Sequence, residues 1–479
     1  MQLFGVLLVL VVTLSVGIVA GRKVKNSSDY TVAGKRSSTA AVAGMIIGAL
    51  LGGSSTIGTA QAAYQYGLSA WWFTLGAGLG CLILGTFLAR ALRSADVETI
   101  PQFLTRSYGA PMRPGIAVAD SIGIFLTIPA QITSAIALLA VAFPTGHTTT
   151  TLIVAVLVAL FCLTGGAISA GAAGIAKLIF IYLALLAIAI VAVVLAGGVG
   201  ALFTGLPSDF TSLVGHNGGP GIHDGIATMI GVWATQIYVL SVFSARSLRA
   251  ARAGTYLAGF GMIIFGLGGV AAGLYMRTHR PGIKPVEALP LFIKEHFTGL
   301  ASGLVLGALL ITVIASAAAL ALGISTMLTR DLFQHFVRPE ASDKALVLFA
   351  RITLLVMIVL GVVVASSNII KLIVEYSFLA FALRAATIAV PLLAAVAFPR
   401  SRLISIGGGV GAAVGGLLTD IILSSLGAPY VIYWALLASV VGLAIGTLVY
   451  PRRIQAPGEQ HMTMGTRSND LPAVKRSAE

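Results

Sequence analysis

Long apolar runs recur along the whole length of this chain, and they limit its possible folds more than any other feature. Each run is about 18 residues or longer, which lets a helix cross the hydrocarbon core of a bilayer. The runs lie near residues 2–20, 38–65, 69–92, 114–143, 149–168, 172–199, 226–247, 254–277, 300–329, 343–366, 370–399, 403–425 and 428–450. With 57% hydrophobic and 10% charged residues, the composition excludes a soluble domain. The sequence predicts an all-α polytopic membrane protein with about 13 transmembrane helices.

The basic residues predict the orientation of the chain. All but six of the 30 Lys and Arg residues fall in alternate loops on one side or in the C-terminal tail. Because cytoplasmic loops are enriched in Lys and Arg, the N-terminus is expected outside and the C-terminus in the cytoplasm, across an inner or plasma membrane. The net charge of +14 then faces anionic lipid, which removes the argument for nucleic acid. The lipid bilayer is the expected partner, and nothing in the sequence indicates the oligomeric state.

A five-plus-five organisation follows from the spacing of the runs. The segment 201–225 has no Lys or Arg and separates two blocks of five runs, 38–199 and 226–399. Since five is odd, the second block enters the membrane from the opposite side, as in an inverted repeat. Residues 1–450 are expected to form one transporter domain, with one leading helix and two trailing helices at 403–450. The polar tail 451–479 is predicted to be cytoplasmic and disordered, and it is too short for the signalling module of a transporter-like sensor.

The second run is interrupted in its middle by glycine and hydroxyl residues. Gly52 and Gly53 are followed directly by Ser54, Ser55 and Thr56. A helix is expected to open there, and unwound backbone inside a bilayer must be buried in protein or line a watery cavity. Such a break is typical of the binding site of a secondary transporter, so the three hydroxyl residues are candidates for substrate binding. The alternative is that their hydroxyls only satisfy nearby backbone groups.

Several short segments resemble a known family. They are DYTVAGK at 29–35, GGSSTIG at 52–58, YGL at 66–68, STMLTRD at 325–331, and PLL at 391–393 leading to FPR at 398–400. In order and spacing they resemble the sodium:solute symporter family, which includes sodium/proline and sodium/galactose symporters. The resemblance implies a LeuT-type fold and sodium-coupled uptake of sugars, amino acids, carboxylates or vitamins, with no organic cofactor.

The resemblance also implies a sodium site. Its ligands would be the carbonyls of Gly48 and Leu51, the carbonyl of Thr312, and the Ala315–Ser316 pair. This chain departs from the family there, because Ala315 replaces a hydroxyl residue and an expected acidic residue is missing two positions after Lys177.

Lys177 allows two interpretations. The first is a lysine whose ammonium snorkels to the membrane surface. The second is an ammonium that replaces the sodium ion, in which case the lysine could carry a proton instead. Proton coupling through Lys177 is therefore the alternative to sodium coupling.

Further candidates for substrate binding lie in the seventh and eleventh runs. Thr235, Gln236 and Tyr238 fall where the family places polar residues that face the substrate, although polar groups also join helices structurally. Arg384 lies in the middle of the eleventh run, where an unpaired charge is costly. Its guanidinium could bind a substrate carboxylate in a bidentate manner, or form a structural ion pair with Asp120 or Asp420.

Catalytic motifs are absent from the sequence. It contains no HExxH, no GxSxG and no phosphate-binding loop with Lys and Ser/Thr, so neither an enzyme nor an ATP-driven pump is expected. A channel is disfavoured because no segment repeats as a selectivity filter would. The sequence therefore predicts a sodium-coupled secondary symporter of a small polar solute that carries a carboxylate.

Overall fold

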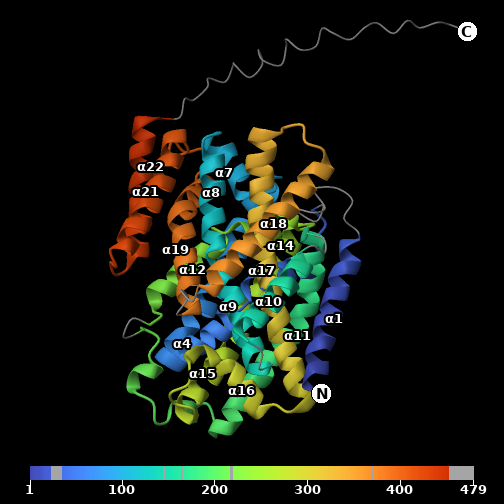
Figure 1. Cartoon of the computed structure of the whole chain (residues 1–479). Coiled ribbons are helices and arrows are strands. Elements are labelled where there is room, and N and C mark those ends of the chain that lie inside the picture. The colour runs from blue at the N-terminus through green and yellow to red at the C-terminus, as the bar shows by residue number, and fades with distance from the viewer. Residues whose placement is uncertain (23–34, 144–145, 163–165, 216–218, 368–371, 452–479) are drawn as a thin grey trace, which may run out of the picture.

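The computed structural model describes residues 1–22, 35–143, 146–162, 166–215, 219–367 and 372–451. Within these ranges the regular structure is helical, apart from one isolated parallel bridge between Ser37 and Ala245 (Figure 1). The first elements are α1 (Gln2–Gly21), α3 (Thr39–Leu50), η2 (Ser54–Gly58), α4 (Thr59–Tyr66), η3 (Gly67–Trp71), α5 (Trp72–Ile83), η4 (Leu84–Leu88), α6 (Ala89–Ser94), α7 (Ile100–Tyr108), α8 (Met112–Phe125), α9 (Thr127–Ala142), α10 (His147–Cys162), α11 (Gly166–Ala196), η5 (Gly200–Phe203) and η6 (Ser208–Thr211).

The remaining elements begin after the long loop. They are α12 (Ile222–Trp233), α13 (Gln236–Ser244), α14 (Leu248–Phe265), α15 (Leu267–His279), η7 (Pro285–Glu287), α16 (Ala288–His296), α17 (Gly299–Met327), η8 (Leu328–Val337), α18 (Asp343–Ser366), α19 (Ile373–Arg384), η9 (Ala385–Ala389), α20 (Val390–Ala397), α21 (Ile406–Ser425) and α22 (Val431–Val449).

The helices confirm the predicted all-α membrane architecture. Among the described residues nine helices are long and apolar enough to cross a membrane, and a bent pair raises the number to ten. Three shorter apolar helices, at Gln2–Val16, Thr39–Leu50 and Thr148–Phe161, accompany them. The count from apolar runs was higher because a run can be broken, as at Leu51–Gly53, or can continue into the next one, as over Ser54–Ser94.

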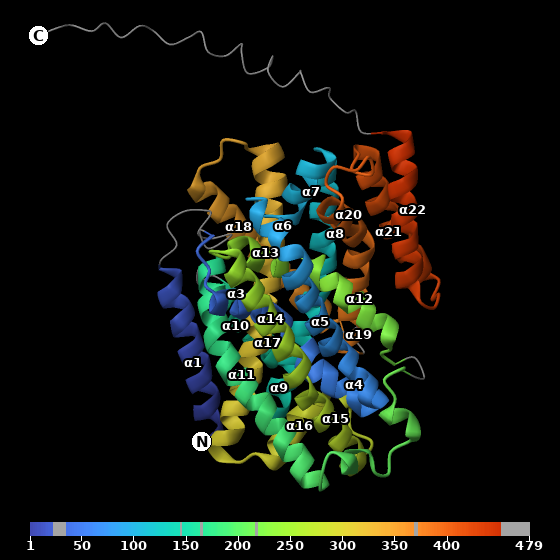
Figure 2. The same cartoon turned by 180° about the vertical axis from the view of Figure 1, so that it is seen from behind.

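Helix α17 is the central element of the bundle. In an apolar 18-residue stretch of the span Gly299–Val337, which contains α17, 94% of the residues are buried. In the corresponding stretch of α22 only 28% are buried. Figures 1 and 2 show α1 on one flank of the molecule and the α21–α22 pair on another. Glycines allow the two trailing helices to approach closely: a Cβ added to Gly411 would lie 2.2 Å from the carbonyl oxygen of Gly442.

Two helices are broken near the middle of the bundle. The first break separates α3 from α4 at residues 51–53, and a π-helical turn follows it. The second separates α12 from α13 at Ala234 and Thr235, where the axis bends by 41°. The sequence predicted the first break from its glycines, but it gave no such signal for the second, which contains none.

The halves α3 and α13 lie side by side and run in opposite directions. The amide of Ser37, just before α3, donates to the carbonyl of Ser244 at the end of α13 over 2.9 Å. The amide of Arg246 donates back to the carbonyl of Ser37 over 2.9 Å. Consequently α3 ends at the first break, whereas α13 begins at the second.

Candidate transport site

The glycines of the first break are required by the close approach of α9. The amide of Gly53 donates to Oε1 of Gln131 over 2.5 Å. A Cβ on Gly53 would lie 2.2 Å from Oγ of Ser134, and one on Gly52 would lie 2.8 Å from Cβ of Ser316. The missing side chains therefore let two neighbouring helices reach the opened backbone.

The three hydroxyl residues of the break bond mainly to protein groups around it. Oγ of Ser55 donates to the carbonyl of Gly52 over 3.0 Å, and Oγ1 of Thr56 donates to the same carbonyl over 2.8 Å. Oγ of Ser54 shares a hydrogen bond of 2.6 Å with Oγ of Ser377 on α19. Ser55 and Thr56 thus supply the hydrogen bonds that the broken helix lacks, and Ser54 joins the break to α19.

The Lys177 side chain ends at the first break. It comes from α11, is fully buried and does not snorkel. Its Nζ donates to the carbonyl of Gly48 over 2.8 Å, to the carbonyl of Thr312 over 2.8 Å and to Oγ of Ser316 over 3.0 Å. An ammonium has three N–H donors, so each of them has an oxygen acceptor here.

The Lys177 ammonium meets three of the oxygens that the family resemblance assigns to sodium. The fourth, the carbonyl of Leu51, accepts a hydrogen bond of 3.1 Å from Oγ of Ser316, and Ala315 offers no side-chain oxygen. A sodium ion bound to these atoms would lie against the Lys177 ammonium, whose like charge repels it. In this arrangement the residues present do not fit a sodium ion.

Arg384 is the second fully buried cation of the core. It ends α19, and its Nε donates to the carbonyl of Ala380 over 2.7 Å. Its guanidinium lies over the ring of Phe381, 4.5 Å from the centroid. Among the described residues neither Nη1 nor Nη2 has a hydrogen-bond partner, and no carboxylate lies within 4.0 Å. The structure therefore does not contain the ion pair with Asp120 or Asp420 that the sequence left open.

A buried carboxylate lies at the start of α13. Oδ2 of Asp120, from α8, accepts a hydrogen bond of 3.0 Å from the amide of Gln236, the first residue of that helix. Free amides at a helix start carry a partial positive charge, which the carboxylate balances. Its other oxygen, Oδ1, has no partner among the described residues. Asp120 and Arg384 thus bring opposite charges to one region, and each has unpartnered polar atoms.

The candidates of the seventh run have three different environments. Oγ1 of Thr235 donates to the carbonyl of Gly231 over 2.5 Å, within its own chain segment. The side-chain amide of Gln236 accepts from the amide of Ile100 over 2.8 Å and donates to the carbonyl of Glu98 over 3.0 Å. The ring of Tyr238 stacks on that of Phe381 with centroids 6.2 Å apart, beside the Arg384 guanidinium. Of the three side chains, only that of Tyr238 shares a contact with Arg384 among these interactions, because both lie against the Phe381 ring.

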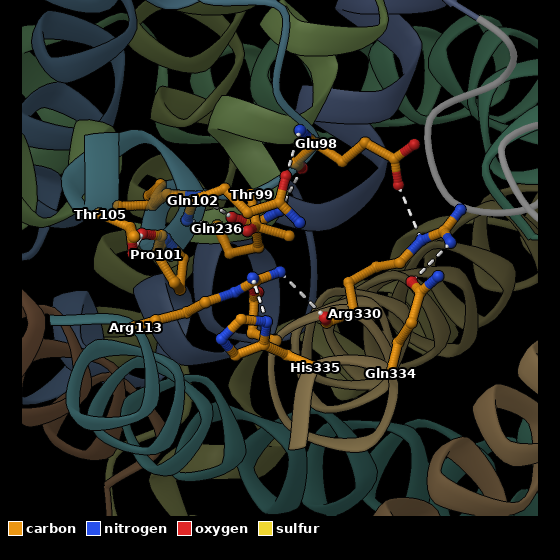
Figure 3. Close-up of polar contacts among 12 residues, drawn as sticks. Glu98, Thr99, Pro101, Gln102, Thr105, Arg113, Gln236, Arg330, Gln334 and His335 are labelled. Carbon is orange, nitrogen blue, oxygen red and sulfur yellow. Dashed lines mark hydrogen bonds and ion pairs between the residues drawn. The ribbon is translucent and has the colours of Figure 1, made fainter. Parts of the chain in front are cut away.

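Polar contacts around Gln236 connect four elements at the end of the bundle where α7, α8 and η8 meet (Figure 3). Glu98 pairs with Arg330 over 2.9 Å, and Arg113 pairs with Asp331 over 2.8 Å. Arg113 also contacts Nδ1 of His335 over 2.9 Å. Gln236 is the first residue of α13 and directly follows the second break. The network therefore connects this break to the surface at that end of the bundle.

Comparison with known proteins identifies the family. A profile of the sodium:solute symporter family matches residues 30–415, most of the chain. The chain belongs to the sodium:solute symporter family. It is therefore a transporter and not an enzyme.

The relatives of this symporter include carriers of different solutes. It is 26% identical over 387 residues to the osmoregulated proline transporter OpuE of Bacillus subtilis, which covers 77% of this chain and 78% of the relative. It is 22% identical over 379 residues to the sodium/glucose cotransporter of Vibrio parahaemolyticus, with 71% and 69% covered. It is 25% identical over 383 residues to the human high affinity choline transporter 1, with 74% and 66% covered.

Solved structures establish the LeuT-like fold of this symporter. A Na⁺-coupled sialic acid symporter in its substrate-bound outward-open state superposes with a TM-score of 0.77 at 14% identity, covering 95% of this chain and 99% of that one. Mhp1, a nucleobase-cation-symport-1 family transporter, superposes with a TM-score of 0.54 at 14% identity, covering 89% and 97%. These likenesses concern the fold alone.

Three residues of the site had no signal of their own in the sequence. Gln131 and Ser134 contact Gly53, and Ser377 bonds to Ser54. A fourth residue, Asp120, was considered from the sequence only as an ion-pair partner of Arg384, because a carboxylate within the membrane is costly. Its position at the start of α13 became visible only in the structure.

Proposed function

We propose that this protein is a secondary symporter that takes up a small polar solute bearing a carboxylate, and that Lys177 couples its transport to protons. The observation that carries the coupling is the bonding of Lys177 Nζ to Gly48, Thr312 and Ser316. A protonated lysine there holds the opened end of α3 against α17. A neutral amine keeps fewer donors and would loosen it, which links protonation to the alternating access of the two sides.

Sodium coupling is the second candidate, and family membership favours it. For sodium to use the carbonyls of Gly48, Leu51 and Thr312, with Ala315 and Ser316 beside them, the Lys177 side chain would have to leave the position it occupies. A variant that removes the charge of Lys177 therefore distinguishes proton coupling from sodium coupling.

The substrate proposal rests on Arg384. Two unpartnered nitrogens on a fully buried guanidinium suit a carboxylate, which accepts two parallel hydrogen bonds from this group. The unpartnered Oδ1 of Asp120 suits a positive group on the same solute. Relatives are named as proline transporters, and proline carries both charges. Tyr238 and Ser54 are proposed to line the solute-binding space beside Arg384 and Asp120. The backbone around this space is proposed to be held in place by the side chains of Ser55, Thr56, Thr235 and Gln236.

The proposed topology has thirteen spans, with the N-terminus outside and the C-terminus in the cytoplasm of an inner or plasma membrane. Residues 38–199 and 226–399 would form the two inverted repeats, and 403–450 the trailing helices. The opposite directions of α3 and α13 support this arrangement, since each belongs to the first helix of its block.

Uptake into proteoliposomes tests the function. Labelled proline, a monocarboxylate and glucose would each be offered under an inward proton gradient without sodium, and under an inward sodium gradient at equal pH on both sides. We expect carboxylate solutes to accumulate with the proton gradient and glucose not to accumulate. Accumulation with sodium alone would overturn proton coupling, and accumulation of glucose alone would overturn the carboxylate assignment.

A further inference from the structure

An acidic pocket lies between the core and the two trailing helices. Its volume is about 510 Å³, within the usual range for small-molecule sites. It is formed by the beginnings of α12 and α19 and by the turn between α21 and α22, which lie near one another on one flank of the molecule (Figure 1). Asp224, Glu375 and Asp420 line it, and its described lining includes no Lys or Arg. The pocket therefore favours a positively charged occupant.

Asp420 is the residue that indicates a ligand. It is 1% exposed, and its Oδ1 has no hydrogen-bond partner among the described residues. Asp224, by contrast, accepts a hydrogen bond of 3.0 Å from the amide of Gly221 and pairs with His223 over 3.2 Å. A buried carboxylate without a partner costs several kcal/mol, so a cation bound in the pocket would recover part of that cost.

An apolar groove continues from the acidic pocket. Its volume is about 650 Å³, and it shares Ala428, Pro429 and Tyr430 with the pocket. The rest of its lining is mostly apolar and comes from α21 and α22, with Leu423, Trp434 and Val441 among its walls. The residues Tyr430 and Trp434 are more than half exposed, as is typical of aromatic residues at a membrane–water interface.

We propose that the pocket and the groove together bind one phospholipid with an ethanolamine headgroup. The primary ammonium of the headgroup occupies the acidic pocket beside Asp420, and an acyl chain lies along the groove past Trp434. In the topology proposed above this is a lipid of the outer leaflet. Two features select it over other occupants: the carboxylates repel an anionic headgroup, and a free cation leaves the apolar groove without a role. This inference concerns a site whose lining contains none of the residues assigned above to solute binding or coupling, and it does not depend on the identity of the solute.

Native mass spectrometry of the delipidated full-length protein tests the site. Phosphatidylethanolamine and phosphatidylglycerol with identical acyl chains would be titrated separately, and free ethanolamine would be added as a competitor. We expect one phosphatidylethanolamine to bind about tenfold more tightly than phosphatidylglycerol, and ethanolamine at equal concentration not to displace it. Equal binding of the two lipids would overturn the proposal. Displacement by ethanolamine would identify a small-cation site and would overturn it as well.

Two variants locate the lipid, and each has a matched control. Asp420→Asn keeps the shape and removes the charge, so binding should weaken about tenfold, as expected for loss of a hydrogen bond to a charged group. Asp209→Asn removes an exposed carboxylate that does not line the pocket and should leave lipid binding unchanged.

Val441→Trp fills the groove and should weaken lipid binding. Val440→Trp changes a neighbouring exposed position outside the groove and should not weaken it. Unchanged binding in both Asp420→Asn and Val441→Trp would refute the site.

Discussion

The two helix breaks of this symporter are stabilised by charges of opposite sign. Helix α3 ends at its break and presents backbone carbonyls, which carry the negative end of the helix dipole, and the Lys177 ammonium binds one of them. Helix α13 begins at its break and presents backbone amides, and the Asp120 carboxylate binds the first of them. The comparison teaches that the direction of the chain through each break determines which charge the site requires.

The two breaks differ in how completely their charges are partnered. Every N–H of the Lys177 ammonium has an acceptor, so the first break is complete without a ligand. At the second break Oδ1 of Asp120 and two nitrogens of Arg384 lack partners among the described residues. We therefore assign coupling to the Lys177 contacts at the first break and binding of the charged groups of the solute to the second, and the following variants test that division.

The largest effect is expected for Lys177→Met. This variant removes the ammonium as a donor to the carbonyls of Gly48 and Thr312, and the Ser316 hydroxyl remains as a donor to Gly48. Proton-driven uptake should fall by at least about a hundredfold, equivalent to roughly 2.8 kcal/mol. Initial uptake rates in proteoliposomes would be compared with those of Lys284→Met, an exposed lysine change that should have no effect. Proton-driven uptake at the wild-type rate in Lys177→Met would contradict the assignment of coupling to the first break.

A smaller effect, confined to binding, is expected for Arg384→Gln. The loss of charge-assisted hydrogen bonds to the solute corresponds to about 1.5–3 kcal/mol, so KM for a carboxylate solute should rise about tenfold to a hundredfold. The thermal midpoint in detergent should change less than KM does, because among the described residues the two Nη atoms have no partner and only the Nε hydrogen bond to Ala380 and the contact with Phe381 are lost. Arg384→Lys keeps the charge but not the planar fork, and should fall between the two. An unfolded Arg384→Gln protein together with a functional Arg384→Lys would instead show a structural role.

Asp120→Asn should produce a more modest change at the second break. Asparagine retains an oxygen that can accept from the Gln236 amide, but the negative charge at the start of α13 is lost. The proposed contact of Oδ1 with the positive group of proline would contribute about 1 kcal/mol, so KM for proline should rise about fivefold. A monocarboxylate without a positive group should be affected less, and measuring both solutes side by side checks this. An equal effect on the two solutes would show that Asp120 acts only on the helix.

The smallest effect is expected for Ser316→Ala at the first break. Lys177 would keep its hydrogen bonds to Gly48 and Thr312 and would lose only the hydroxyl at 3.0 Å. One such bond contributes about 1 kcal/mol, so the uptake rate should fall severalfold and the proton dependence should remain. Ser302→Ala, a buried change elsewhere on α17, is the matched control. Loss of activity as complete as in Lys177→Met would mean that the bonds of Ser316 to the carbonyls of Gly48 and Leu51 matter more than its contact with the lysine.

Part of this site could be predicted because it depends on local backbone chemistry. Gly52 and Gly53 marked the first break, since glycine in a long apolar run disfavours a continuous helix. Lys177 and Arg384 were conspicuous because a charge within the membrane is costly. The partners of these residues could not be predicted in the same way. The side-chain amide of Gln236 faces the backbone at 98–100, and the second break contains no glycine, so neither followed from residue type.

The sequence by itself determined that the chain spans a membrane as helices and that one of them opens at Gly52–Gly53. Both follow from hydrophobicity and backbone preference, which act over a few neighbouring residues. Only the tertiary structure decided which charge meets which break. Lys177 binds a carbonyl 129 positions away, and Asp120 binds an amide 116 positions away. Contacts over such separations depend on how α11 packs against α3 and α17, and α8 against α13, and no local pattern encodes that packing.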